Sequence, residues 1–413
     1  MEELNFNKDV IRFRLGEIEI IGNRQNGSYC GLSKEGSRFI DMIENNEKIG
    51  VATKFANRQL LSYLKEANYF DNTVDKNKII SAYLHITNRC NLRCIGCYSE
   101  DCTRNNSADL TIDQEKIILD KLKELGVKFL IISGGETLLR DDLAEIARYA
   151  KENCNVEYLC VLSNGLLLKE DTAKKLSGVV DEYSISIDSY DGDSIAYIRR
   201  ENRFDDLMAA VEIAKKYFKK VNILPTIHRK NVDELDNFII LAKKLNVDIS
   251  FSILTCGQSG ETADLIPERS QLEFLGHSYN PGEQISIRKN AVDEFSMTVC
   301  DKCGVGEQII SVAADGNVYP CHMCHDSSLL LGNMLTDSLH DIITKRDELL
   351  ENVRVDNFTE CKECTYRYLC GGGCRARTYM NGKGLLGKDP YCPMFKEYAS
   401  SFESMLNDKY GSK

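Results

Sequence analysis

The sequence predicts an α/β protein whose central part is an open barrel of parallel strands. Six short apolar segments alternate with amphipathic segments of helical period, and they lie at residues 79–87, 129–133, 156–163, 182–188, 221–227 and 248–253. Strands that alternate with helices pair in parallel through right-handed crossovers. Six such units are too few to close an eight-stranded barrel. We therefore expect a partial (β/α)6 TIM-type barrel over residues 79–285, with its site at the carboxyl ends of the strands.

Length, charge and cysteine content narrow the class of protein. The chain has 413 residues, of which 43% are hydrophobic and 28% charged, as in an ordinary folded protein of two or three domains. Its net charge of -11 argues against a broad nucleic-acid surface. The N-terminus lacks the apolar core of a signal peptide, and no apolar run is long enough to span a membrane. Without a signal peptide or a membrane span we expect a cytoplasmic protein. Because disulfides are rare in that reducing compartment, the 17 cysteines indicate metal binding.

Residues 1–75 predict a small domain that is winged-helix-like in outline. Two extended segments precede two helical ones, at residues 9–14, 17–22, 35–46 and 57–70. The domain carries 10 basic and 12 acidic residues, whereas a DNA-binding wing should be basic. Binding of a peptide along an exposed strand edge is therefore preferred to DNA binding.

The first helix of the barrel has clear end signals, because Thr111 and Gln114 form a capping box and Gly126 provides a stop. Before that helix, directly after the first strand, Cys90, Cys94 and Cys97 follow C-x3-C-x2-C spacing. Three soft thiolates on one loop suit a four-iron cluster with one iron left open for a chelating ligand. A zinc site is the alternative, but it requires a fourth ligand nearby, for which only Cys102 is available.

Glycine, polar and acidic residues follow the next three strands. They are Gly134, Gly135 and Glu136, then Ser163 and Asn164, then Ser186 and Asp188. Two adjacent glycines permit a close backbone approach, and a carboxylate beside them can bind a ligand ammonium. Because parallel strands end at one edge, these residues are expected to line one site.

The cysteine triplet followed by Gly-Gly-Glu resembles the radical S-adenosylmethionine (SAM) superfamily. The resemblance implies that the three thiolates hold a reducing 4Fe–4S cluster whose open iron is chelated by SAM, which is then cleaved to methionine and a 5′-deoxyadenosyl radical. It also implies that the strand-end residues bind SAM, with Arg199 pairing with the SAM carboxylate. The family usually has an aromatic residue before the third cysteine. Gly96 stands there, so Tyr98 is expected near the adenine.

Nine further cysteines lie between Cys300 and Cys392, interrupted by a helical pattern at 337–353. Cys303 and Cys321 frame C-x12-G-x4-C, and the remaining motif is C-x2-C-x5-C-x3-C followed by a last cysteine, formed by Cys361, Cys364, Cys370, Cys374 and Cys392. Two zinc ribbons are the alternative on spacing alone. The order resembles the SPASM extension of radical SAM enzymes, which would make residues 286–413 a domain with two auxiliary 4Fe–4S clusters, three clusters in all.

The same resemblance implies how the ligands divide. One cluster takes Cys361, Cys364, Cys370 and Cys392, and the other takes Cys303, Cys321 and Cys374. Sulfatase-maturing relatives supply a fourth ligand where Ile309 stands here. Cys300 or Cys324 would complete the set, or the iron would stay open for a substrate thiolate. The other five cysteines, Cys30, Cys102, Cys154, Cys160 and Cys256, fit no spacing.

The resemblance implies an oxidoreductase that acts on a peptide. The N-terminal domain resembles the RiPP recognition element, which binds the leader of a ribosomally synthesised precursor peptide, and YLCGGGCRART resembles peptide maturases. We expect an intramolecular cross-link, a Cys thioether of the sactipeptide or ranthipeptide type, with flavodoxin or ferredoxin as the electron donor. C–C cross-linking, epimerisation and formylglycine formation are alternatives. His322, which stands where sulfatase maturases have Asp, is the only catalytic candidate; a non-catalytic metal scaffold that binds DNA is disfavoured.

Overall fold

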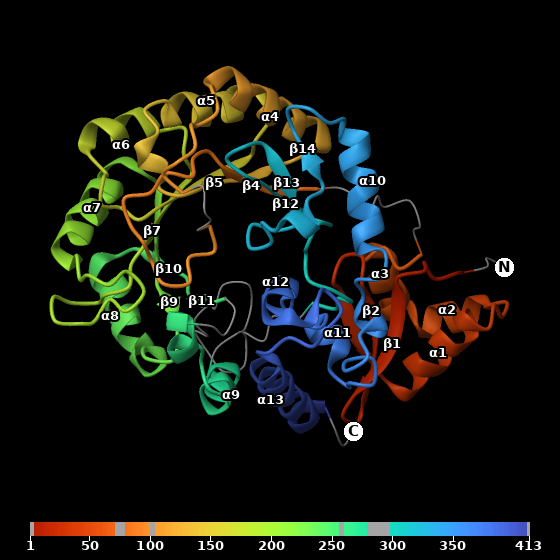
Figure 1. Ribbon diagram of the computed structural model, residues 1–413. Coiled ribbons are helices and arrows are strands. Elements are labelled where there is room, and N and C mark those ends of the chain that lie inside the picture. The colour runs from red at the N-terminus through yellow and green to blue at the C-terminus, as the bar shows by residue number, and fades with distance from the viewer. Residues whose placement is uncertain (1–3, 71–78, 100–103, 256–259, 279–297, 411–413) are drawn as a thin grey trace.

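The computed structural model describes residues 4–70, 79–99, 104–255, 260–278 and 298–410 of the chain. Cys102 and Cys256, and the predicted boundary at residue 285, lie outside these ranges. Figure 1 shows a curved sheet with helices along its outer side and the C-terminal elements toward its open side. None of the helices in the described ranges is both long and apolar enough to cross a membrane.

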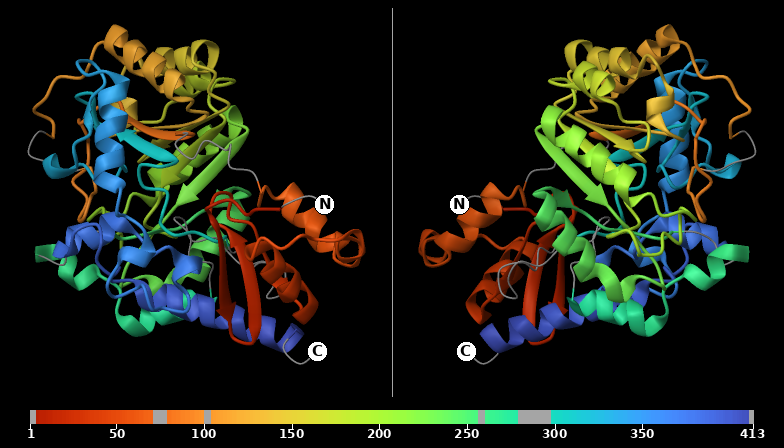
Figure 2. Two further views of the ribbon diagram at one scale, coloured as in Figure 1. Left: turned by 90° about the vertical axis from the view of Figure 1, so that its right-hand side faces the viewer. Right: turned by 90° about the vertical axis from the view of Figure 1, so that its left-hand side faces the viewer.

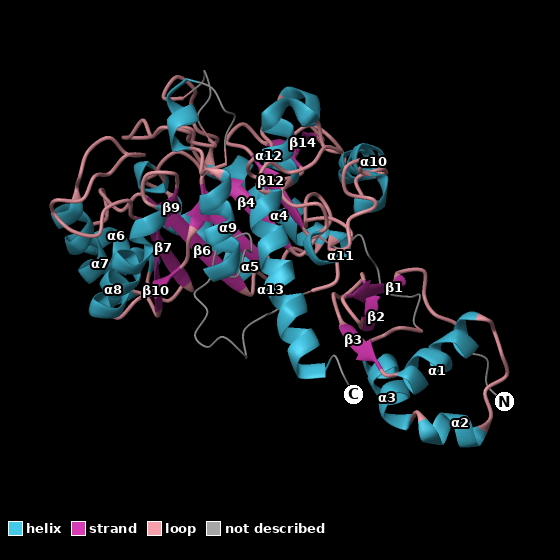
Figure 3. Cartoon of the chain, turned by 90° about the horizontal axis from the view of Figure 1, so that it is seen from below, coloured by secondary structure: helices cyan, strands magenta, loops and turns pink. Residues whose placement is uncertain are grey.

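The N-terminal part is an antiparallel sheet followed by helices, with one strand and one helix more than the two of each that the sequence predicts. Its strands have the order β1–β2–β3, and the elements are β1 (Val10–Leu15), β2 (Ile18–Asn23), β3 (Tyr29–Leu32), α1 (Lys34–Glu44), α2 (Val51–Ala56) and α3 (Arg58–Glu66). Because successive side chains of a strand point to opposite faces, Ile21 packs among Phe39 and Leu64 of the helices. Ile20 packs against Phe402 of the C-terminal helix. The sheet is therefore covered on both faces, and Figure 3 shows it between α1–α3 and the rest of the molecule.

The six predicted barrel strands are confirmed. They pair in parallel in the order β10-β8-β7-β6-β5-β4, with bounds β4 (Ser81–His85), β5 (Phe129–Ser133), β6 (Tyr158–Ser163), β7 (Glu182–Ser186), β8 (Lys220–Leu224) and β10 (Asp248–Ile249). Beyond Pro225, which has no N–H for the ladder, the last two strands continue as the pair β9 (Thr226–Ile227) and β11 (Ser252–Ile253).

Helices cover the outer face of these strands. They are α4 (Ile112–Leu125), α5 (Leu143–Asn153), α6 (Glu170–Leu176), α7 (Phe204–Tyr217) and α8 (Leu235–Leu245). The predicted ends of α4 are confirmed, since Thr111 and Gln114 form a capping box and Gly126 follows with a φ of 91°. Alternate strand residues such as Leu84 and Ile132 are buried in the core beneath these helices. The intervening residues, including Tyr83, His85 and Ser133, are left for the inner face of the sheet.

The C-terminal part extends the barrel sheet, which the sequence analysis did not predict. β12 (Ile309–Val312) pairs in parallel with β4, and the antiparallel strands β13 (Asn317–Tyr319) and β14 (Gly332–Asn333) follow. Over the described residues this nine-stranded sheet stays open. The segment that carries Cys303 and Cys321 is thereby anchored to the strand that leads into the first cysteine loop.

The remaining helices are α9 (Arg269–Ser278), α10 (Leu339–Leu350), α11 (Arg367–Cys370), α12 (Arg375–Thr378) and α13 (Cys392–Tyr410). α10 confirms the helical pattern expected at 337–353. α13 packs along α9 and reaches the N-terminal sheet, beside which it lies in Figure 2. The Val299 N–H also donates to the Gly27 oxygen at 2.9 Å, so the segment before Cys300 is bonded to the N-terminal part.

Candidate radical SAM site

The loop that carries the cysteine triplet is fixed where it leaves β4. Thr87 Oγ1 donates to Asp109 Oδ1 at 2.6 Å, and Arg89 Nε donates to Asp109 Oδ2 at 2.9 Å. A second nitrogen of Arg89 reaches the Leu139 oxygen at 2.8 Å. One carboxylate thus ties the start of the loop to the segment before α4. Sequence reasoning missed Asp109, because nothing local marks it as a partner of residues twenty positions earlier.

Hydrogen bonds also hold the loop along its length. The Cys90 N–H donates to Asn105 Oδ1 at 2.8 Å, and the Ile95 N–H donates to the Ile198 oxygen at 2.8 Å. The second bond connects the centre of the triplet to the residue before Arg199. The loop is therefore held from both sides by segments distant in the sequence.

The two glycines of the Gly-Gly-Glu motif are required by the chain's own backbone. A Cβ on Gly134 would collide with the Thr87 oxygen, and one on Gly135 would collide with the Arg89 oxygen. The N–H groups of Gly135 and Glu136 donate to those same two oxygens, both at 2.8 Å. The close approach inferred from the sequence is thus between the end of β5 and the cysteine loop.

Glu136 joins the ends of β5 and β6. Its buried carboxylate accepts hydrogen bonds from Ser163 Oγ at 2.7 Å, the Asn164 N–H at 2.7 Å and the Leu138 N–H at 3.0 Å. Burial raises the pKa of Glu136, and these hydrogen bonds oppose the rise. Asn164 Nδ2 then donates to Asn91 Oδ1 of the cysteine loop at 2.7 Å. Three predicted strand-end residues therefore form one network with the loop.

Arg199 pairs with another predicted residue, Asp188, from Nε to Oδ2 at 2.9 Å. Burial raises the pKa of Asp188, and the Arg199 charge opposes that rise. Arg199 also lies within electrostatic reach of Cys94 and Glu136. A small cavity beside the loop is lined by Arg199 and Asn164, among other residues. Ser186 ends β7 on the same edge.

The surroundings of the three thiols suit an iron–sulfur cluster. Arg104, which is 4% exposed, donates from Nη2 to Cys97 Sγ at 3.4 Å. Cys90 Sγ accepts the Leu92 N–H at 3.4 Å. Burial raises the pKa of the Cys94 thiol to about 11, and the Arg199 charge opposes this. Two guanidinium groups and a backbone N–H are therefore available to stabilise thiolates when a metal displaces their protons.

The C-terminal thiols form two neighbouring groups. Cys303, Cys321 and Cys374 lie within electrostatic reach of one another. Cys303 accepts backbone N–H groups of Val305 and Arg375. Cys374 Sγ accepts the Arg377 N–H at 3.4 Å. N–H donors directed at sulfur are typical of cluster ligands.

The second group contains the four remaining motif thiols, Cys361, Cys364, Cys370 and Cys392. Cys300 lies between the groups, within reach of Cys303 and Cys370. Cys324 hydrogen-bonds the Cys321 thiol, and its N–H donates to the Cys321 oxygen at 2.9 Å. No three metal-binding side chains among the described residues converge as they would on a single ion; a four-iron cluster holds its thiolates apart.

His322 packs in a cluster of aromatic and histidine rings. It stacks on Tyr83 with ring centres 3.9 Å apart and meets Tyr98 edge-on at 5.2 Å. The Tyr98 hydroxyl lies 3.0 Å from Ser133 Oγ. The ring of His85, a residue that sequence reasoning missed, has its centre 4.6 Å from the centre of the His325 ring. The only sequence signal for His85 was its position two residues after Tyr83, which places both side chains on the same face of the strand.

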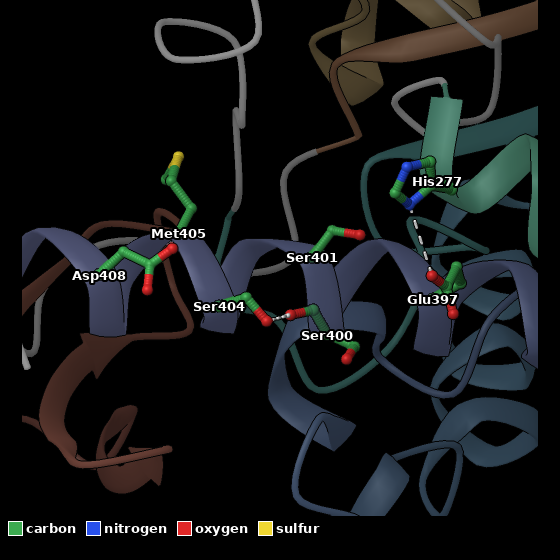
Figure 4. Close-up of a pocket in the computed structure, with 7 residues that line it drawn as sticks. All are labelled: His277, Glu397, Ser400, Ser401, Ser404, Met405 and Asp408. Carbon is green, nitrogen blue, oxygen red and sulfur yellow. Dashed lines mark hydrogen bonds and ion pairs between the residues drawn. The ribbon is translucent and has the colours of Figure 1, made fainter.

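A surface depression elsewhere contains none of the predicted site residues. It follows α13 and the end of α9, and Figure 4 shows its lining residues, His277, Glu397, Ser400, Ser401, Ser404, Met405 and Asp408. His277 Nδ1 lies 3.5 Å from Glu397 Oε1. The depression shares no lining residue with the strand-end network around Glu136, Asn164 and Arg199.

Comparison with known proteins identifies two domains in the chain. The Radical SAM superfamily matches residues 84–242, and the SPASM iron–sulfur cluster-binding domain matches residues 303–365. The chain therefore contains a radical SAM domain followed by a SPASM domain. The resemblance inferred from the cysteine spacing is confirmed, and so are an enzymatic function and the use of SAM and 4Fe–4S clusters.

Curated relatives of this radical SAM enzyme differ in their substrates. Mycofactocin maturase MftC of Mycolicibacterium smegmatis is 28% identical over 321 residues, covering 74% of this chain and 81% of the relative. The AdoMet-dependent heme synthase of Methanosarcina barkeri is 25% identical over 339 residues, covering 74% of this chain and 94% of the relative. The sequence likeness alone therefore does not select a substrate.

Solved structures share the fold. Native anSMEcpe with bound AdoMet has a TM-score of 0.62 at 20% identity, covering 81% of this chain and all of that chain. Streptococcus suis SuiB bound to precursor peptide SuiA has a TM-score of 0.56 at 14% identity, covering 94% of this chain and 99% of that chain. The partial-barrel fold class is confirmed.

Proposed function

We propose that this radical SAM enzyme is a peptide maturase that installs an intramolecular Cys thioether in a ribosomally synthesised precursor peptide. The observation that carries the proposal is the N-terminal three-stranded sheet with its two edge strands, which is a recognised way to bind an extended peptide. SuiB, which matches 94% of this chain, was solved with a precursor peptide. Heme synthesis from a porphyrin needs no such peptide-binding edge.

The chain's residues would bind and orient the reactants. The network of Glu136, Asn164 and Arg199 beside the cysteine loop supports SAM binding at the strand ends. When bound, the cluster and SAM supply the radical that removes a hydrogen atom from a substrate carbon. Forming the carbon–sulfur bond then releases the thiol proton and one electron, so the product has lost two hydrogen atoms. An auxiliary cluster is the proposed acceptor of that electron.

We also propose that the auxiliary clusters follow the two thiol groups, with Cys324 as the fourth ligand beside Cys321. The contact between the Cys324 and Cys321 thiols supports this choice. Cys300 is less well placed because it also borders Cys370 of the other group. A small cytoplasmic electron carrier of the flavodoxin or ferredoxin class would reduce the first cluster.

Leader binding can be tested on the full chain by hydrogen–deuterium exchange. A leader that adds a strand should protect the backbone amides of β1 or β3, the two edges of the sheet. The edge strand that the leader does not pair with should show little change in hydrogen–deuterium exchange. Saturating peptide that protects no amide between residues 4 and 70 would exclude recognition by this sheet.

The activity itself is tested by anaerobic reconstitution with SAM, a reductant and Cys-containing precursor peptides. Thioether formation predicts loss of two hydrogen atoms, one 5′-deoxyadenosine per product, and a cysteine that iodoacetamide no longer alkylates. A C–C link leaves that cysteine alkylatable, and epimerisation leaves the mass unchanged. A chain with alanine at Cys90, Cys94 and Cys97 is the matched control. Turnover of an iron porphyrin, with every peptide unmodified, would refute the proposal.

A further inference from the structure

One buried aspartate, Asp389, is hydrogen-bonded to both groups of C-terminal cysteines. Asp389, which is 2% exposed, accepts the Cys374 N–H at Oδ2 over 2.6 Å. Its backbone oxygen accepts the Cys392 N–H at 3.0 Å. Cys374 belongs to the thiol group of Cys303 and Cys321, whereas Cys392 belongs to the other. A single residue therefore sets the backbone at a thiol of each group.

Both oxygens of the Asp389 carboxylate accept hydrogen bonds from N–H donors. Oδ1 accepts the Tyr391 N–H at 2.8 Å and Arg377 Nε at 2.7 Å. Oδ2 accepts Arg377 Nη2 at 2.6 Å in addition to the Cys374 N–H. Each oxygen thus has two donors, and the buried Arg377 cation, which is 5% exposed, is held in a two-pronged pair.

The same pair connects the cysteines to the barrel. The Arg377 guanidinium lies over the Tyr391 ring, 4.0 Å from its centre, and the Tyr391 hydroxyl donates to the Leu254 oxygen at 2.8 Å. Leu254 directly follows β11. Asp389 therefore lies where the barrel end meets both thiol groups.

We propose that Asp389 is a positioning residue that sets Cys374 and Cys392 relative to each other, so that the two auxiliary clusters form as one coupled unit. This inference rests on the proposed function, in which those thiols hold two clusters. It predicts that a change at Asp389, which is no ligand in that scheme, disturbs both clusters. Loss of a ligand confined to one group should disturb chiefly that group's cluster.

Asp389→Asn is a sharp variant because the side chain keeps its size. Whichever way the amide turns, its NH₂ group faces two donors that now have no acceptor, and the charge opposite Arg377 is lost. Gly373→Ala tests the same point independently, because a Cβ there collides with Asp389 Oδ2. Gly382→Ala is its matched control: Gly382 also has positive φ, 72° against 78°, but nothing lies within 4 Å of its Cβ.

The experiment uses the full chain with alanine at Cys90, Cys94 and Cys97, reconstituted with iron and sulfide. This background should bind about eight irons, and its reduced electron paramagnetic resonance spectrum should contain two cluster signals. Cys303→Ala should remove one signal and Cys364→Ala the other. Asp389→Asn and Gly373→Ala should alter or remove both, whereas Gly382→Ala should leave both unchanged.

The outcomes separate the two proposals. A background chain that binds about four irons or fewer refutes the two auxiliary clusters, whatever Asp389 does. A background with both signals, in which Asp389→Asn and Gly373→Ala alter one signal or neither, overturns the role of Asp389. If Asp389→Asn fails to fold by circular dichroism, Gly373→Ala against Gly382→Ala decides.

Discussion

Asp109→Asn should loosen the first cysteine loop without changing a thiol. The carboxylate accepts a hydrogen bond from Thr87 Oγ1 at 2.6 Å and pairs with Arg89, whose side chain is 40% exposed. Hydrogen bonds to charged groups contribute about 1.5–3 kcal/mol each. Because Arg89 is partly solvated, its share is discounted. The variant should lose about 2 kcal/mol of the free energy that stabilises the loop in its observed conformation, which corresponds to about 30-fold weaker binding of the cluster.

The assay is the release of iron to a chelator under anaerobic conditions, followed together with 5′-deoxyadenosine formation. Asp120→Asn is the control, since that carboxylate contacts Tyr149 on the outer helices, with Asp120 Oδ1 3.1 Å from the hydroxyl. The control should release iron as the unsubstituted chain does. Equal release from Asp109→Asn and from the unsubstituted chain would refute the view that Asp109 fixes the loop.

Three further predictions concern Glu115, Gly135 and Cys324. Burial raises the pKa of Glu115 to about 8, so the neutral acid stabilises the fold at low pH, and the melting temperature should fall as pH rises from about 5 to 8. Glu115→Gln should make the melting temperature less dependent on pH over this range, and an unchanged dependence would contradict the prediction. Gly135→Ala should abolish cluster binding at the triplet, while Gly50→Ala, with nothing within 4 Å of its Cβ, should not; normal iron content in the first variant would be contrary evidence. Cys324→Ala should change the spectrum of the Cys303 cluster more than Cys300→Ala does, and the reverse order would assign Cys300 as the ligand.

The barrel could be predicted because its signals are local. Each strand is a short apolar run, and a capping box and a glycine bound the first helix at Thr111 and Gly126. Parallel strands end at one edge, so residues such as Glu136, Asn164 and Asp188 were expected to meet there, and the structure brings them to that edge. The addition of β12 to β4 carried no such signal, because its four pairs join residues more than 200 positions apart.

The partners of the predicted residues were harder to infer. Arg199 was expected to pair with a SAM carboxylate, and within the chain the structure pairs it with Asp188. The glycines of the Gly-Gly-Glu motif were expected to permit a close approach, and the structure shows that the approaching group is the backbone of Thr87 and Arg89. Residue type indicated the chemistry in both cases, but contact depends on which distant segment packs alongside.

The sequence by itself indicated an iron–sulfur cluster, because thiols a few residues apart on one loop are brought together by covalent connection alone, and the resemblance to the radical SAM superfamily implied SAM. It also determined that the barrel strands pair in parallel, which alternating strands and helices joined by right-handed crossovers indicate. Only the tertiary structure decided that the cysteine segment extends the barrel sheet and that Asp389 is bonded to Cys374 and Cys392. Such contacts arise from the packing of separate elements, which no spacing along the chain encodes.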